Sequence, residues 1–76
     1  MPSLKPISYK LVIKAFETEG FLYNRTRGDH LIYTRPDVKR PLVIPKWDAI
    51  PVFILKNLIR TAGMTRERFL ALIGTV

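Results

Sequence analysis

The spacing of apolar residues changes at Gly20, and this change predicts a fold that mixes helix with strand. Before it, apolar side chains recur at intervals of three and four positions, at Tyr9, Val12, Ile13 and Phe16. This stripe predicts an amphipathic helix with Ser8 as its N-cap and Gly20 as its stop. Beyond Gly20, residues 21–26 and 31–34 are short aromatic and β-branched stretches, which are typical of strands.

Turn signals divide the middle of the chain into an antiparallel meander. Residues 27–30 contain Gly28 and predict a tight turn, and residues 35–38 predict a second one. Residues 40–45 predict a third strand, and Pro41 indicates that it is an edge strand or begins there. Alternation puts His30, Ile32 and Thr34 on one side of the second strand and Leu31, Tyr33 and Arg35 on the other. Both sides contain apolar residues, so the pattern leaves open which side is the core.

The last third of the chain predicts two more helices. Asp48 is the expected N-cap of the first, with Pro51 in its first turn and Gly63 at its end. Thr65 is the expected N-cap of a short helix over residues 66–73. The side chains expected to face inward are Leu55, Leu58, Ile59 and Ala62 in the first helix, and Phe69, Leu70 and Ile73 in the second.

These elements predict an α+β fold of two layers, in which helices cover one face of a three-stranded antiparallel sheet. Residues 1–76 are expected to form a single domain, with residues 1–7 as a loose N-terminal arm because they carry two prolines and no period. The chain has no cysteine, so no disulfide supports the core. No apolar run is long enough to cross a bilayer, and a soluble, cytoplasmic protein without a membrane partner is expected.

The charge of the chain points to a polyanionic partner. Thirteen lysines and arginines oppose six acidic residues, for a formal net charge of +7. A small basic domain of this kind attracts nucleic acid, although a solubilising surface or an acidic protein partner would also fit. Tyr23 and Tyr33 are expected to fill the core, while Trp47, in a loop, fits either stacking on a base or packing.

His30 is the only histidine and the only evident candidate for acid–base catalysis. It follows a glycine turn, with Arg25 and Arg27 just upstream. Its imidazole can exchange a proton near neutral pH. The six carboxylates are scattered and cysteine is absent, so neither a metal site nor a cofactor is predicted.

Five short motifs along the chain together form a recognisable pattern. They are Gly20-Phe21 after the first helix, Arg25-Thr26-Arg27-Gly28-Asp29-His30, Val43-Ile44-Pro45, Leu58-Ile59-Arg60-Thr61-Ala62-Gly63-Met64-Thr65, and Arg66-Glu67-Arg68-Phe69-Leu70. In this order the chain resembles the HicA (YcfA-like) toxins over about residues 8–73. It departs from them at Trp47, where many members have a second histidine, and at Phe53-Ile54-Leu55, where Gly-Thr-Leu is usual.

The resemblance implies a double-stranded-RNA-binding-like fold and the activity of an mRNA interferase, the toxin of a type II toxin–antitoxin system. It implies a HicB-type antitoxin as the protein partner, with the toxin a monomer alone or part of a hetero-oligomer. The family's catalytic histidine falls on His30. The residues expected to contact RNA are Lys14, Arg25, Arg27, Gly28, Arg35, Lys46, Trp47 and Lys56.

The expected reaction needs no metal, because RNA carries its own nucleophile in the ribose 2′-hydroxyl. His30 would act as the base, and Arg25 and Arg27 would hold the phosphate. The proton donor for the leaving oxygen stays unassigned, and Asp29 is expected to shape the turn more than to orient His30. A non-catalytic RNA-binding module is the alternative, and a protein-interaction domain is a third possibility.

Overall fold

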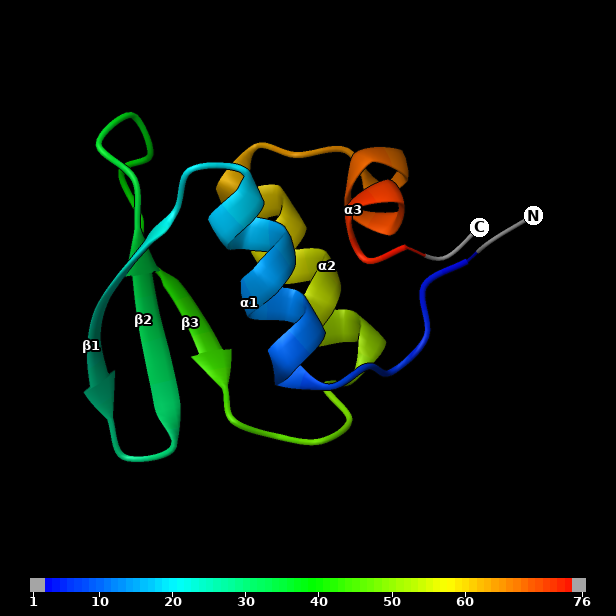
Figure 1. Cartoon of the computed structure of the whole chain (residues 1–76), viewed down its shortest axis with the longest axis horizontal. Helices are drawn as coiled ribbons and strands as arrows, with labels where there is room; N and C mark the ends of the chain where they lie inside the picture. Colours follow the sequence, from blue (N-terminus) through cyan, green and yellow to red (C-terminus); the bar gives the residue numbers. More distant parts are fainter. Residues whose placement is uncertain (1–2, 75–76) are drawn as a thin grey trace.

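A computed structural model describes residues 3–74 of the chain as three helices and one sheet (Figure 1). The elements, in chain order, are α1 (Tyr9–Thr18), β1 (Leu22–Arg27), β2 (His30–Thr34), β3 (Leu42–Pro45), α2 (Val52–Ala62) and α3 (Arg66–Leu72). The sheet is antiparallel with the strand order β1-β2-β3. The predicted α+β fold and the order α-β-β-β-α-α are therefore confirmed.

Helix α1 begins and ends where its sequence predicts. The side chain of Ser8 accepts a hydrogen bond from the backbone N–H of Lys10 at 3.2 Å, which satisfies one of the unpaired donors of the first turn. Gly20 has a φ of 90°, a left-handed conformation that favours glycine and lets the chain turn towards β1. The buried face of the helix consists of Val12, Ala15 and Phe16.

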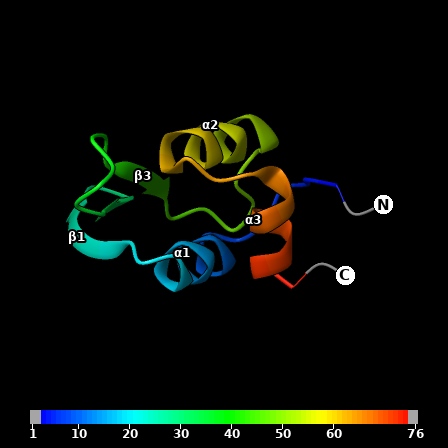
Figure 2. The ribbon, with the colours of Figure 1, turned by 90° about the horizontal axis from the view of Figure 1, so that it is seen from above.

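The sheet meets the helices mainly through β3, which contacts both α1 and α2. Viewed from above, α3 lies at the end of the helical layer that faces away from the sheet, and it contacts α1 and α2 (Figure 2). Strand β1 is exposed along its whole length, and its pairing with β2 shifts register between Tyr23 and Arg25. The β1–β2 hairpin therefore extends beyond the helices.

The inner face of the sheet is set by Tyr33, which is 3% exposed and belongs to the hydrophobic core. Leu31 packs against the same core. Because side chains alternate along a strand, His30 and Ile32 lie on the opposite, open face. Ile32 is nevertheless buried, since β2 is the central strand and has a neighbour on each side.

The prediction that Tyr23 fills the core is wrong. Its side chain is 56% exposed, because β1 lies beyond the cover of the helices. Its hydroxyl lies 2.6 Å from that of Thr26, and its ring meets the edge of Tyr33 at a centroid distance of 5.9 Å. Tyr23 thus packs only on the rim of the inner face.

Helix α2 begins later than predicted, so Asp48 as its N-cap is wrong. The N-cap is Pro51, which makes no side-chain hydrogen bond to the helix. The reason is that the chain before Pro51 is extended, and Ile50 forms a bridge to Ile7 with its N–H donating to the Ile7 carbonyl at 2.7 Å. The predicted inward residues Leu55, Leu58, Ile59 and Ala62 are buried, and Gly63 ends the helix with a φ of 71°.

Residues 3–7 are attached to the domain rather than loose. Ile7 makes the bridge to Ile50, and Leu4 and Ile7 both pack against the core. The rest of the predicted arm, residues 1 and 2, lies outside the described residues.

Helix α3 closes the core at the far end. Thr65 caps it as predicted, accepting from the backbone N–H of Arg68 at 3.1 Å, and Phe69 is fully buried 5.7 Å from the ring of Phe16. Arg68 also lies 2.9 Å from the carboxylate of Glu19, just after α1. The hydrogen bond from its guanidinium is the main reason that the pKa of Glu19 is lowered.

One hydrogen bond joins the central strand to α1, and it predicts a loss of stability at alkaline pH. The hydroxyl of Tyr33 donates to Glu17 at 2.8 Å, and burial together with Glu17 raises the pKa of Tyr33 from 10.0 to about 12. Between these values the unfolded chain loses the proton while the folded one keeps it, so folding stability falls by up to about 2.7 kcal/mol. Urea unfolding at pH 9 and pH 11.5 measures this loss. Tyr33→Phe should remove that part of the loss, and an equal loss in both proteins would contradict the assignment.

Candidate active site

His30 lies at the start of β2, on the open face of the sheet. It is opposite Arg27 on β1 and Pro45 on β3. The two-residue turn before it contains Gly28, whose φ of 58° is left-handed and therefore favours glycine. The turn fixes the hairpin register and so brings Arg27 and His30 side by side.

A shallow hollow in the open face of the sheet surrounds this pair. Its lining residues are Arg27, Gly28, His30, Ile32 and Val43. The apolar floor comes from the two neighbouring strands, since Ile32 is opposite Val43. One end of the hollow is basic and the other apolar, which suits a nucleotide with its phosphate near His30.

The imidazole of His30 contacts two side chains, Asp29 and Trp47, that come from different segments. Its Nδ1 lies 2.9 Å from Oδ1 of Asp29, and the indole Nε1–H of Trp47 donates to Oδ2 of the same carboxylate at 3.2 Å. The rings of His30 and Trp47 meet edge to face with centroids 6.4 Å apart. The side chain of His30 remains 41% exposed, so a substrate can reach it. Asp29, expected mainly to shape the turn, also contacts the imidazole.

Five of the eight predicted RNA-contacting residues gather at this end of the sheet. Arg25 and Arg27 share the open face, because they are opposite Ile32 and His30. Gly28 lines the hollow, and Lys46 is tied to the turn by its backbone N–H, which donates to the carbonyl of Asp29 at 2.7 Å. The fifth residue of this group is Trp47.

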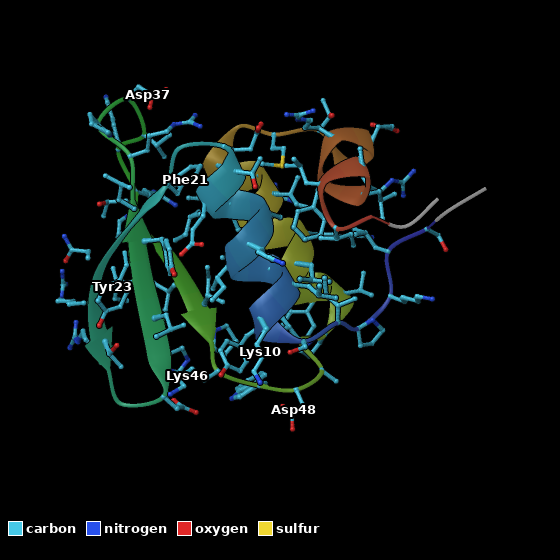
Figure 3. All side chains as sticks on the ribbon, in the orientation of Figure 1. Lys10, Phe21, Tyr23, Asp37, Lys46 and Asp48 are labelled. Atoms are coloured by element: carbon cyan, nitrogen blue, oxygen red, sulfur yellow. The ribbon has the colours of Figure 1, made fainter. Side chains whose placement is uncertain are left out.

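The other three predicted contacts lie elsewhere. Lys14 and Lys56 are exposed on α1 and α2, outside the hollow. Arg35 follows β2 at its far end, where its guanidinium donates to the carbonyl of Glu19 at 2.6 Å and to Asp37 at 2.7 Å. Figure 3 shows Lys46 and Asp37 at opposite ends of the sheet.

Sequence reasoning missed the apolar floor of the hollow, Ile32 and Val43. Alternation along the second strand places Ile32 on the same side as His30. Val43 joins the floor of the hollow only through the pairing of β3 with β2, which the sequence does not reveal. Val43 also lines a second hollow, between β3 and α2, with Arg40 and Asn57 among its polar residues. No signal in the sequence singled out Asn57.

Residues 3–74 contain neither a metal-holding group of side chains nor a membrane-spanning helix. Among residues 3–74, no group of three or more histidine, cysteine, aspartate or glutamate side chains is placed to hold a metal ion. No helix within the same range is long and apolar enough to cross a membrane.

Comparison with protein families decides the relationship that the motifs suggested. The family described as "HicA toxin of bacterial toxin-antitoxin" matches residues 9–64, from the start of α1 to just beyond α2. The chain belongs to the HicA toxin family. The HicA match includes the whole sheet, Trp47, and the turn that precedes His30. No curated protein matches the chain.

The contrast between two arginines of this HicA chain gives a prediction about stability. Arg35 covers the ring of Phe21 at 4.5 Å and donates to a backbone carbonyl, whereas the guanidinium of Arg27 forms no hydrogen bond or ion pair with any described residue. Arg35→Ala should therefore lower the free energy of unfolding by about 1 to 2 kcal/mol. Arg27→Ala should leave it nearly unchanged. Urea unfolding of the two variants measures this, and equal losses would contradict a structural role for Arg35.

Proposed function

We propose that this chain is the toxin of a type II toxin–antitoxin system and a metal-independent endoribonuclease that blocks translation by cleaving mRNA. The observation that carries the proposal is the position of His30, which lies in an open hollow beside Arg27 with its Nδ1 facing a carboxylate. An imidazole in this setting presents Nε2 to a substrate. Membership of the HicA toxin family supports the same function.

In the proposed reaction, His30 acts as a general base. Neutral His30 removes the proton of a ribose 2′-hydroxyl, and the resulting oxygen attacks the adjacent phosphorus. The bond from phosphorus to the 5′-oxygen then breaks, which leaves a 2′,3′-cyclic phosphate and a 5′-hydroxyl. Arg27 and Arg25 stabilise the charge that develops on the phosphate oxygens. The donor of the proton to the 5′-oxygen is not assigned to a residue.

The proposed partners are RNA and an antitoxin protein. RNA binds along the open face of the sheet, where Arg25, Arg27 and Lys46 supply positive charge and Trp47 offers a ring for stacking. A HicB-type antitoxin neutralises the toxin in the cytoplasm. The alternative function is a non-catalytic RNA-binding module that uses the same residues without cleavage.

Cleavage of RNA in EDTA tests this function. The wild-type protein should cut a mixed-sequence RNA and leave the matching DNA intact, because DNA has no 2′-hydroxyl. His30→Ala should lower the rate by at least about 100-fold, the usual contribution of a general base. Absolute dependence on magnesium, or equal cleavage of DNA, would refute the mechanism. Binding without cleavage by either protein would favour the RNA-binding module.

The salt dependence of RNA binding tests the contact surface separately from chemistry. In the His30→Ala background, where RNA is expected to stay intact, Arg27→Ala should weaken binding to single-stranded RNA. It should also reduce the slope of log affinity against log salt by about 0.7, the value for one phosphate contact. Arg66→Ala, which removes an exposed arginine of α3, is the matched control and should change neither. Equal slopes for the two variants would place the RNA elsewhere.

A further inference from the structure

We propose that Asp29 and Trp47 are positioning residues that keep the proton of neutral His30 on Nδ1 and so leave Nε2 as its basic nitrogen. This inference rests on the proposed ribonuclease function for its kinetic consequence. The placement of the three side chains can be tested without RNA.

Both oxygens of the Asp29 carboxylate face a ring nitrogen. Oδ1 lies 2.9 Å from Nδ1 of His30, within hydrogen-bond distance, and Oδ2 accepts from the indole of Trp47 at 3.2 Å. An ionised carboxylate only accepts, and an indole N–H only donates. The Trp47 bond therefore fixes the direction of one oxygen, and the other oxygen lies where it would accept a hydrogen bond from a protonated Nδ1.

The arrangement is tied to the rest of the fold by backbone hydrogen bonds. The carbonyl of Trp47 accepts from the N–H of Tyr9 at 3.0 Å, which anchors Trp47 to the first turn of α1. The N–H of Lys46 donates to the carbonyl of Asp29 at 2.7 Å, which anchors the β1–β2 turn to the end of β3. The indole and the carboxylate are thus held by separate segments that the fold brings together.

Asp29 and Trp47 orient the His30 ring but contribute little to the stability of the fold. The side chain of Asp29 is 62% exposed, so solvent screens its charge and an ion pair here contributes little to stability. A neutral imidazole, however, has a single N–H, and the nitrogen that carries it cannot act as a base. Holding that N–H towards Asp29 keeps the reactive lone pair on Nε2.

Nitrogen-15 NMR of the imidazole gives the first test, and it is simple because His30 is the only histidine of the chain. At a pH at which the ring is neutral, the wild-type spectrum should show Nδ1 protonated and Nε2 unprotonated. Asp29→Ala, which removes both contacts, and Trp47→Phe, which removes only the indole N–H, should both shift the ring towards a mixture of tautomers. Phe53→Ala removes an exposed ring elsewhere, on α2, and should leave the spectrum unchanged.

RNA cleavage gives the second test. Asp29→Ala and Trp47→Phe should each lower kcat by about tenfold with little change in KM. Asp29 is not among the predicted RNA contacts, and Trp47→Phe keeps an aromatic ring for stacking while removing the indole N–H. The side chain of Asp29 is 62% exposed and Trp47 is 40% exposed, so the variants are expected to fold, which backbone NMR spectra would verify.

The outcomes separate the two proposals. If the wild type cleaves no RNA but the tautomer shifts as described, the positioning pair stands and the proposed ribonuclease function fails. If the tautomer is Nε2–H in the wild type, or does not change in Asp29→Ala, the positioning pair is overturned. A shift in Asp29→Ala without one in Trp47→Phe overturns the role of Trp47.

Discussion

The burial of Tyr33 determines where the site can form. Its ring lies in the core and its hydroxyl bonds to Glu17 of α1, so β2 can present only one of its faces to the helices. A shift of the strand by one residue would bury His30 and expose Leu31 and Tyr33, exchanging apolar burial for an imidazole in the core. The packing that stabilises the sheet is thus also what directs His30 towards the open face.

The two ends of the sheet use arginine for different purposes. At one end Arg35 is engaged by Phe21, by Asp37 and by the carbonyl of Glu19, and it holds the chain beyond β2 against the end of α1. At the other end Arg27 lies beside His30 in an open hollow. A residue whose donors are already satisfied gains little from a phosphate, whereas an exposed guanidinium can bind one at small cost.

Local signals predicted most of the fold. The caps at Ser8 and Thr65 and the left-handed glycine after α2 each act within a few residues, so the sequence alone located them. Features that depend on distant pairing were missed. The bond between Trp47 and Asp29 joins residues 18 positions apart, and it exists only because β3 returns beside the β1–β2 turn. Asp48 failed as a cap because Ile50 pairs with Ile7, which no local pattern reveals.

Position 47 also limits how the proposed reaction can end. Many HicA-like sequences have a second histidine there, which could exchange a proton, whereas the indole of Trp47 donates a hydrogen bond and keeps its proton. In this chain the position can therefore orient Asp29 but cannot protonate the leaving 5′-oxygen. After the first step of the proposed reaction, His30 is an imidazolium and carries the proton that it took from the 2′-hydroxyl. Return of that proton, either directly or through water, to the 5′-oxygen would balance the proposed cycle without a second histidine.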